Sequence, residues 1–417
     1  MRDKDLYATI LGVRAPWLVR EVELRSAAQE VEVFIEHDGS EGLRCPKCGQ
    51  ACGRHDTRRR SWRHLDTCQF RTTLTAEVPR VQCPEHGVLQ LEVPWSERGS
   101  RFTAMFEGLA IDWLREANLT AVSRRLRVSW DELDGIQQRA VRRGLARRAA
   151  EPIVRVGVDE TSFQRRHEYV TVVSDLARGR VVHVADGRGQ EALEGFYRGL
   201  TAPQRLAIEA VAMDMWRPYI QATQAQLPGW ATAVCFDRFH VAKHLGEAVN
   251  DVRKSEQRVL LAEGDDRLKR TRFLWLMGPQ RRAQLDAEQR GRFDALRGST
   301  LKVARAWALK ETARELWRYT HRGWALRGWQ RWLGWAARSR LEPMRKAARM
   351  LKEHLWGVIN AVVQGITNAT AESLNAKIQR VKKNACGFRN RERFRTAILF
   401  HCGGLDLYPR PATHPIS

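Results

Sequence analysis

The stretch that most constrains the fold of this chain lies between Ile153 and Asp237, where short apolar runs alternate with turn residues. Ile153–Val158 is short, mostly apolar and rich in β-branched residues, which predicts a buried strand. Two similar runs follow at hairpin spacing, Tyr169–Ser174 and Arg180–Val184, with Asp and Gly in the turns. We therefore expect three strands joined in sequence by tight turns.

A helix and two further strands complete the pattern. Glu191–Leu200 is helix-like, and strands are expected at Ala207–Met213 and Ala231–Phe236, with an amphipathic segment between them. The order β-β-β-α-β-α-β is that of a ribonuclease-H-like core. Carboxylates end the first, fourth and fifth of these strands: Asp159, Asp214 and Asp237.

The charge of the chain indicates a polyanionic partner. The 417 residues carry 71 Lys and Arg against 48 Asp and Glu, a net charge of +23, and Arg is spread over the whole length. Nucleic acid is the simplest partner for such a balance, because a membrane-binding helix would concentrate the charge in one segment. The sequence has neither an apolar run of membrane-spanning length nor the apolar stretch of a signal peptide, so we expect a cytoplasmic protein.

Two short knuckles near the N-terminus predict a zinc ribbon. They are Cys45-Pro-Lys-Cys48-Gly and Cys83-Pro-Glu-His86-Gly, and together they supply the four tetrahedral ligands that zinc favours. A closed four-ligand site is structural rather than catalytic. The alternative is a small β-subdomain with ordinary reduced cysteines. Nearby residues leave the ligand set open, since one of them could replace His86 or a second ion could bind: Cys52, His55, His64 and Cys68.

The next segment predicts a helix-turn-helix. Apolar residues recur at helical spacing from Phe102 to Leu114, a short helix is expected at Ala121–Leu126, and Ser129 can cap a helix over Trp130–Arg143. The alternative is a three-helix packing unit without a ligand. Local arginine density favours DNA binding through Arg124, Arg125, Arg127, Arg139, Arg142 and Arg143.

From Leu245 to about Val363 the sequence is helical throughout and carries eight of the fifteen tryptophans between Trp275 and Trp356. Most of these are expected to pack inside an α-helical bundle, with one or two left to stack on an extruded base. The large core residues are expected to include Trp317, Trp324, Trp332 and Trp335. His240 and His244 have the i, i+4 spacing of metal ligands, but the Glu that accompanies such a pair in metalloproteases is absent.

A helix expected after Thr370 carries a further candidate acid, Glu372. Glu372, Asn375 and Gln379 share one of its faces, and a separate basic stripe of the helix predicts DNA contact through Lys377, Arg380 and Lys383. An acid in so basic a helix attracts a cation. We expect Asp159, Asp214 and Glu372 to converge at the end of the sheet, where they would hold two Mg²⁺, or Mn²⁺, for in-line attack on a phosphodiester. Taken singly, each acid could be a solvated surface group.

At this point the sequence resembles a known family. The segments VGVDETSF, AVAMDMWRPYI, CFDRFHVAKHL and TNATAESLNAKIQRVKKNACGFRN, with the two knuckles, are similar to the bacterial ISL-three insertion-sequence transposases from about Cys45 to Leu405. The resemblance implies a DDE enzyme with a ribonuclease-H-like core interrupted by a helical insertion. It assigns Asp159 as the first Asp and Glu372 as the Glu. Asp214 is the favoured second Asp, with Asp237 and His240 as an accessory or alternative pair.

The expected fold is therefore α+β and multidomain. Its parts are a segment with a zinc ribbon (1–98), a helix-turn-helix (99–150), the first part of the core (151–244), an all-α insertion (245–363), the final core helices (364–405) and a loose tail (406–417). The expected function is binding of terminal inverted repeats by a homodimer or larger assembly, followed by DNA cleavage and strand transfer. The alternatives are a DNA-binding regulator without catalysis and a nuclease that cuts without joining.

Overall fold

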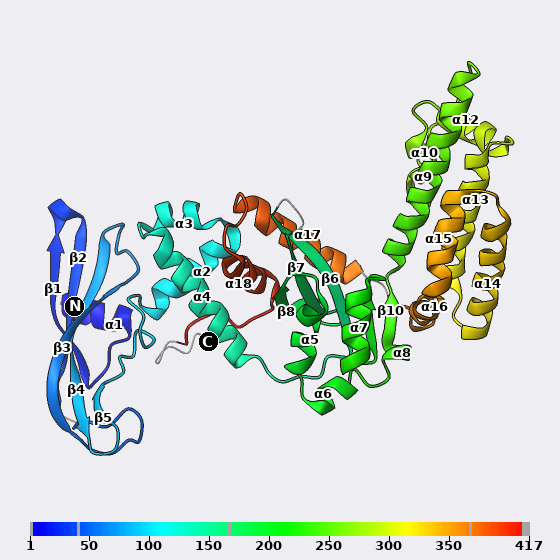
Figure 1. Ribbon diagram of the computed structural model, residues 1–417. Helices are drawn as coiled ribbons and strands as arrows, with labels where there is room; N and C mark the ends of the chain where they lie inside the picture. Colours follow the sequence, from blue (N-terminus) through cyan, green and yellow to red (C-terminus); the bar gives the residue numbers. More distant parts are fainter. Residues whose placement is uncertain (1–2, 40–41, 165–167, 367–368, 411–417) are drawn as a thin grey trace. The chain divides into compact units, whose positions relative to one another are not determined.

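The computed structural model describes residues 3–39, 42–164, 168–366 and 369–410, and the chain divides into two compact units (Figure 1). One unit comprises Met1–Ala149 with Leu405–Ser417, and the other comprises Ala150–Gly404. Within the described ranges, no helix has both the length and the apolar character needed to cross a membrane.

The first unit begins with a helix and a five-stranded sheet: α1 (Asp3–Leu11), β1 (Trp17–Arg25), β2 (Glu30–His37), β3 (Gly53–Arg63), β4 (Arg71–Cys83) and β5 (Gly87–Gln90), with the 3-10 turn η1 (Ser26–Ala28) after β1. The order is β1-β2-β4-β3, with β5 also paired to β4, and only β2 and β4 run parallel. Alternate residues of β2 face the core. There Trp95 meets Trp17 and Trp62 edge to face, with ring centroids 5.1 and 5.5 Å apart.

Three helices follow in the predicted order: α2 (Ala104–Glu116), α3 (Leu119–Leu126) and α4 (Trp130–Arg147). Ser129 caps α4 as expected, and with Glu132 it forms a reciprocal capping box. Arg127 ends α3 in the left-handed region, with φ of 55°, which turns the chain between the two helices. The helix-turn-helix layout is therefore confirmed.

The segment from Leu405 to Arg410 packs on this helical unit instead of hanging loose. Leu407 is buried, and the Arg143 guanidinium donates to its carbonyl oxygen. Gly144 in α4 makes the approach possible, because a Cβ there would lie 2.6 Å from the Cβ of Leu405. The expectation of a loose tail is therefore wrong up to Arg410, and its remainder, 411–417, lies outside the described residues.

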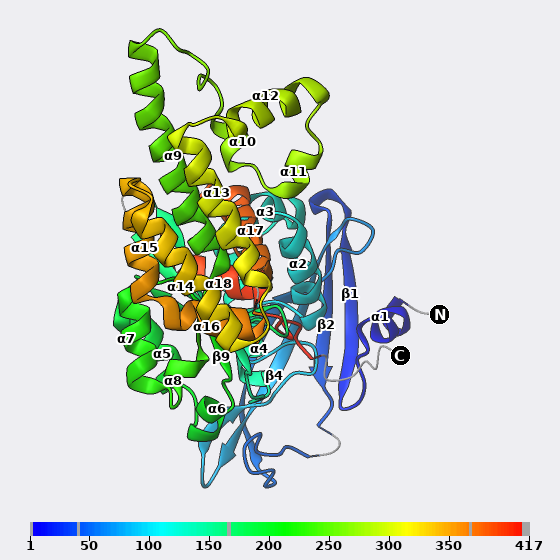
Figure 2. The same cartoon turned by 90° about the vertical axis from the view of Figure 1, so that its right-hand side faces the viewer.

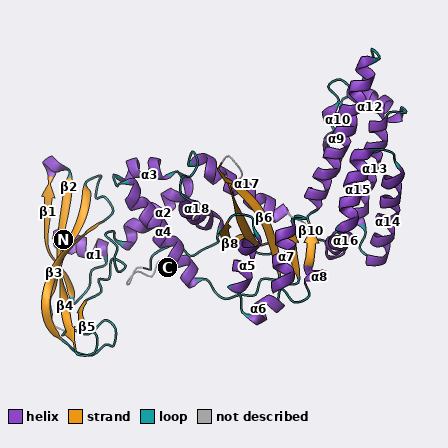
Figure 3. Ribbon diagram, in the orientation of Figure 1, coloured by secondary structure: helices purple, strands orange, loops and turns teal. Residues whose placement is uncertain are grey.

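The second unit contains a five-stranded sheet built from β6 (Arg155–Gln164), β7 (Glu168–Asp175), β8 (Arg180–Asp186), β9 (Ala210–Met213) and β10 (Val234–Phe236) (Figure 3). Its order is β10-β9-β6-β7-β8. The pairs β6–β7 and β7–β8 are antiparallel, whereas β6–β9 and β9–β10 are parallel.

Several strand ends differ from the sequence prediction, and β9, for example, begins at Ala210 instead of Ala207. The first strand was expected to end at Asp159, but β6 continues to Gln164 because its ladder with β7 extends to Glu168. The fifth was expected from Ala231, but a short helix, α8 (Trp230–Ala233), occupies that position and leaves only three residues in β10.

Helices cover both faces of this sheet. On one face lie α5 (Gln190–Arg198) and α7 (Arg217–Gln226), with the short α6 (Ala202–Leu206) between them in the chain. Their apolar residues join those of β6 and β9 in one core. On the other face lie α17 (Ala369–Asn384) and α18 (Arg391–Cys402), where Leu374, Ile378 and Phe394 pack on alternate residues of β7. The sheet is therefore the middle layer of three.

Between β10 and α17 the described residues form helices alone: α9 (Arg238–Ala262), α10 (Arg272–Leu276), α11 (Pro279–Ala283), α12 (Ala287–Gly298), α13 (Lys302–Glu315), the 3-10 turn η2 (Leu316–Arg318), α14 (Arg322–Arg338), α15 (Glu342–Glu353) and α16 (Leu355–Gln364). The long helices α9, α13, α14 and α15 form a bundle (Figures 1 and 2). Asn360 of α16 donates to the Val234 carbonyl of β10, and Gly357 allows Phe236 to approach, since a Cβ there would lie 2.5 Å from its ring.

The tryptophans of this bundle are divided between core and surface. Trp332 is buried as expected, and so are Trp275 and Trp329. Trp324 and Trp335 are 54% and 41% exposed, so the prediction that they are core residues is wrong. Both lie on α14, whose remaining face already packs against its neighbours.

Candidate active site and metal centre

Three carboxylates lie in a row across neighbouring strands in the second unit: Asp159 lies within β6, and Asp214 and Asp237 directly follow β9 and β10. Gly157 of β6 is level with Ala212 of β9, so the same register two residues further on brings Asp159 level with Asp214. Phe236 of β10 is level with Met213, and the next residue, Asp237, donates its backbone N–H to the Met213 carbonyl. Residues that are level in adjacent parallel strands point to the same face of the sheet, so the three side chains share one face. Neighbouring strands are about 4.8 Å apart.

His240 links two of these acids. Its Nδ1 is 2.8 Å from Asp237 Oδ2, and its Nε2 is 3.8 Å from Asp214 Oδ2. The hydrogen bond with Asp237 outweighs partial burial and, with the charge of Asp214, raises the pKa of His240 to about 8. The imidazole is therefore cationic at neutral pH and balances negative charge at this edge.

Helix α17 places its polar face against β6. Asn375 donates to Asp159 Oδ2, and Gln379 donates to Thr161 Oγ1 at 2.6 Å. One turn further on, Lys382 donates to the Ser162 carbonyl at 2.7 Å. The predicted shared face is thus confirmed for Asn375 and Gln379, and it fixes the helix that carries Glu372.

The acids experience one another's charge. Burial raises the pKa of Asp159, and the charge of Asp237 adds to the effect while His240 opposes it. The pKa of Glu372 is also raised, first by desolvation and then by Asp237 and Asp159. Such repulsion is relieved when carboxylates share a cation, and oxygen ligands of this kind suit Mg²⁺ or Mn²⁺. The donor set therefore fits a divalent hard metal.

The sequence left Asp214 and Asp237 as alternatives for the second acid, and their surroundings differ. Asp237 is 5% exposed; it caps α9 by accepting from the Phe239 N–H and also bonds His240. The carboxylate of Asp214 is 39% exposed and accepts from the next backbone N–H. Charge coupling favours Asp237, since it perturbs both Asp159 and Glu372. We nevertheless favour Asp214 because its carboxylate is more exposed. The buried carboxylate of Asp237 already caps a helix, so it has fewer oxygen lone pairs to offer a metal.

A separate group in the first unit has the geometry of a zinc site. The ligand atoms of Cys45, Cys48, Cys83 and His86 all lie within 4.8 Å of one another, and within the described ranges this is the one Cys, His, Asp or Glu group so closely gathered. The Cys48 and Cys83 sulfurs are 3.8 Å apart, and Cys83 Sγ is 3.6 Å from His86 Nδ1. A zinc tetrahedron with Zn–S bonds of about 2.3 Å and a Zn–N bond of about 2.05 Å has edges close to these lengths.

The Cys83 thiol is also prepared for metal binding. Burial alone would raise its pKa, but hydrogen bonds from His86 and from nearby backbone N–H groups lower the pKa of Cys83 to about 6. The thiolate, the form that binds zinc, therefore predominates at neutral pH.

Three of the four residues that left the ligand set open lie away from this group, whereas Cys52 lies beside it, where burial and the neighbouring Cys83 raise the pKa of Cys52. His64 is buried and bonds Thr103 Oγ1 at 2.9 Å, whereas Cys52 donates to the Gln50 carbonyl. His55 faces Asp56, and Cys68 is exposed in a turn. The structure therefore gathers the two knuckles alone.

The helix-turn-helix arginines fall into two classes, which the sequence did not distinguish. Arg143 is 7% exposed and contacts Glu97 and Glu107, while Arg139 donates to Glu107 at 2.6 Å. Arg127 pairs with Asp66. Their guanidinium groups already contact acids inside the unit, which argues against DNA contact by Arg139 and Arg143 and, less strongly, by the more exposed Arg127.

The other predicted basic residues remain at the surface. In α3 and α4 these are Arg124, Arg125 and Arg142, and in α17 they are Lys377, Arg380 and Lys383. Arg125 also lies over the Trp113 ring, 4.8 Å from its centroid, which restricts its motion.

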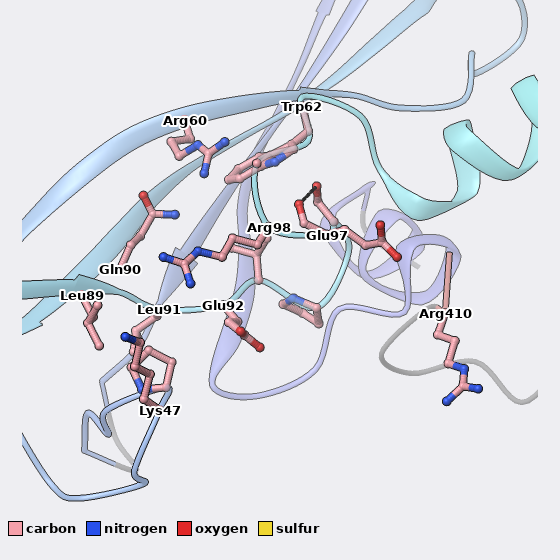
Figure 4. Close-up of a pocket in the computed structure, with 15 residues that line it drawn as sticks. Lys47, Arg60, Trp62, Leu89, Gln90, Leu91, Glu92, Glu97, Arg98 and Arg410 are labelled. Atoms are coloured by element: carbon pink, nitrogen blue, oxygen red, sulfur yellow. Dashed lines mark hydrogen bonds between the residues drawn. The ribbon is translucent and has the colours of Figure 1, made fainter. Parts of the chain in front are cut away.

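A basic cavity adjoins the first zinc knuckle (Figure 4). Its volume is about 550 Å³, and its charged lining consists of Lys47, Arg60, Glu92, Glu97, Arg98 and Arg410. Arg60 lies over Trp62, 5.2 Å from its ring centroid, and both project from β3. Cations outnumber acids in this lining, and Glu97 is already paired with Arg143.

Some residues near the acids were not singled out from the sequence. Lys382 follows Gln379 by three positions and Asn375 by seven, so helical periodicity could have placed it on the same face. Arg188 and Trp216 come together only in the fold, where the Trp216 indole N–H donates to the Arg188 carbonyl at 2.9 Å. No sequence pattern marks that contact.

The row of acids and the basic surfaces together point to a protein that binds DNA and acts on it. A family model described as "Transposase", that of the DDE transposases of the ISL3 family, matches residues 156–398, and the chain belongs to this family. The zinc finger of the transposases of IS204, IS1001, IS1096 and IS1165 matches residues 41–86, and the helix-turn-helix domain of transposase family ISL3 matches residues 91–141.

Two curated relatives span nearly the whole chain. The transposase for insertion sequence element IS1001 of Bordetella parapertussis is 28% identical over 399 residues, covering 94% of this chain and 97% of the relative. The transposase for IS1557 of Mycobacterium tuberculosis is 27% identical over 459 residues, covering 100% and 99% respectively. The sequence-based recognition of the family is therefore confirmed.

Proposed function

We propose that this transposase binds the terminal inverted repeats of an insertion sequence, cleaves the DNA at the element ends and joins the liberated 3′-hydroxyls to target DNA. The proposal rests on one observation above all. Carboxylates on neighbouring parallel strands lie level at one sheet edge, and Glu372 on α17 is electrostatically coupled to two of them, Asp159 and Asp237.

The fold that supports this chemistry is a ribonuclease-H-like core. Its sheet has three antiparallel strands followed by two parallel ones, with helices on both faces. The helices from Leu245 to Val363 are then an insertion between the fifth strand and α17, held to the core through Asn360 and Gly357. Such an insertion keeps Asp214 and Glu372 far apart in sequence but at one edge of the sheet.

Asp159, Asp214 and Glu372 are the proposed catalytic triad and would hold two Mg²⁺ ions. Bound metal would supply the Lewis acidity that in-line attack on a phosphodiester needs. Asn375 donates to one oxygen of the Asp159 carboxylate and the Glu160 N–H donates to the other, so the carboxylate is held in one orientation. His240, bonded to Asp237, would limit charge repulsion at Asp214.

DNA binding is proposed to use both units. The exposed arginines of the helix-turn-helix would contact the repeats, and the basic stripe of α17 would contact phosphates near the cut. The cavity beside the zinc knuckle offers four further cations. Because two ends must be processed together, we propose a homodimer or larger assembly.

The decisive experiment measures Mg²⁺-dependent cleavage and joining of end-containing DNA. Asp159→Ala, Asp214→Ala and Glu372→Ala should each lose roughly a hundredfold or more of cleavage rate while still binding the DNA. Asp237→Asn preserves the shape of the α9 cap and should retain activity. Asp186→Asn, at the end of β8, is the matched control for loss of one acid from the same sheet.

The outcomes separate the alternatives. An inactive Asp237→Asn with an active Asp214→Ala would move the second acid to Asp237. No cleavage by the wild type on verified ends would favour a DNA-binding regulator. Cleavage without any joined product would favour a nuclease.

A further inference from the structure

An arginine clasp, made of Arg188, Tyr169 and Trp216, lies on the face of the core sheet that α5 and α7 cover. The Arg188 guanidinium lies 4.7 Å from the Tyr169 ring centroid and 4.8 Å from that of Trp216. The Trp216 indole N–H donates to the Arg188 carbonyl at 2.9 Å, which fixes the ring against the turn that carries the arginine. Two aromatic contacts therefore hold the guanidinium, and the hydrogen bond holds the Trp216 ring against the Arg188 backbone.

The clasp is close to the candidate catalytic acids. Trp216 is two residues after Asp214 in the chain. The buried Tyr219 hydroxyl, which bonds Thr171, experiences the charges of Asp159, Glu160 and Arg188 together, so these groups share one neighbourhood. Arg188 is thus a cation near the acidic edge, on the opposite face of the sheet from the Asp159 side chain, which α17 contacts.

The guanidinium keeps most of its hydrogen-bonding capacity. An arginine has five N–H donors in a planar fork. Within the described residues its one acidic contact is Glu160 Oε1, at 3.5 Å, the outer limit for a hydrogen bond. The Arg188 side chain is 39% exposed, and Trp216 is 37% exposed. The two aromatic contacts accept no conventional hydrogen bond, so they do not use up the N–H donors of the guanidinium.

We propose that Arg188, oriented by Tyr169 and Trp216, binds a backbone phosphate of the DNA strand that reaches Asp214. The inference rests on the proposed function, because it takes DNA as the ligand of this edge. A planar fork favours phosphate, which can accept two parallel N–H bonds, and a preset orientation reduces the entropy lost on binding. Trp216 is a positioning residue that holds the arginine and adds a ring beside the strand.

The test is a double-mutant cycle of binding affinities, in which one change is a substitution in the protein and the other is a modified phosphate in the DNA. Full-length wild type and Arg188→Gln are titrated, with no added Mg²⁺ or Mn²⁺ and no chelator, against end-containing duplexes that each carry one neutral methylphosphonate at successive positions across the cut. Arg188→Gln should bind unmodified DNA roughly tenfold more weakly and lower the salt slope by about one. At one position the methylphosphonate should weaken the wild type by the same factor and leave Arg188→Gln unaffected.

Two further variants control for charge and folding. Arg198→Gln removes an exposed charge from the same layer, on α5, and should change neither affinity nor salt slope. Arg188→Lys keeps the charge without the fork, and it should retain the salt slope while losing part of the affinity.

The proposal would be overturned if the affinity losses from Arg188→Gln and from the methylphosphonate were additive at every phosphate position. An unchanged salt slope in Arg188→Gln would also overturn it, and the clasp would then have only a packing role. Since the cycle measures binding without added Mg²⁺ or Mn²⁺, it does not depend on cleavage. A coupled phosphate with no cleavage by the wild type would refute the proposed function and leave this contact standing.

Discussion

Arg142 and Arg143 are neighbours in α4, and their substitution by Met should have opposite consequences. Arg143 makes a bidentate contact with Glu97, at 2.7 and 2.6 Å, and a third contact with Glu107 at 2.8 Å. Glu107 is 2% exposed, and the Leu407 carbonyl accepts from the same guanidinium. Removing one partner of a buried ion pair costs about 3–5 kcal/mol. Because Arg139 still neutralises Glu107, we expect Arg143→Met to cost about 3 kcal/mol.

Arg142 is exposed, so Arg142→Met should change stability by less than about 0.5 kcal/mol and instead weaken DNA binding, with a salt slope lower by about one. Hydrogen exchange in the full-length protein distinguishes the two effects. The α2 and α4 amides should exchange roughly a hundredfold faster in Arg143→Met and at the wild-type rate in Arg142→Met. Unchanged exchange in Arg143→Met, together with a DNA-binding defect equal to that of Arg142→Met, would refute the buried-network reasoning.

Two further predictions concern the first unit. Cys83→Ser should abolish bound zinc, measured by mass spectrometry of metal content, whereas Cys52→Ser, outside the ligand group, should keep it; equal retention would place the ion elsewhere. Burial, with a smaller effect from Arg63, lowers the pKa of His64 to about 4, so between this value and about 6.5 the unfolded chain binds a proton that the folded chain does not. Stability should therefore fall by about 3 kcal/mol as the pH drops through that window, and less in His64→Gln; equal urea midpoints for both proteins at each pH would contradict this.

The order of elements in the core was predictable because local patterns set it. The apolar runs and their turn residues located all five strands, and one acid followed each of three strands that later proved to be neighbours. Strand ends were less predictable. β6 extends beyond Asp159 because β7 continues to offer hydrogen-bonding partners, which is a property of the pair and not of the β6 sequence.

The zinc group was predictable to the residue because its ligands come in two compact knuckles. The role of the surrounding residues was not. His64 resembles a ligand in sequence, yet it bonds Thr103, 39 residues away, and only the fold brings those two groups together. The exposure of the tryptophans in α14 was similarly unpredictable. The sequence pattern predicts that both Trp324 and Trp332 are buried, but the packing of neighbouring helices buries only Trp332 of these two.

The arginines show why a basic composition overstates the DNA-contacting surface. Arg127 pairs with Asp66 and Arg143 with Glu97, acids that lie 61 and 46 residues away in the chain. A sequence reader sees only that arginines are dense in this segment, and density is the same whether a guanidinium faces solvent or a buried carboxylate. A guanidinium paired with a carboxylate adds little to counterion release on DNA binding, although Asp66 is shared between Arg63 and Arg127. The dependence of this unit's DNA affinity on salt concentration should therefore reflect mainly the exposed arginines and much less the paired ones. Measuring it would show which arginines the fold leaves available to DNA.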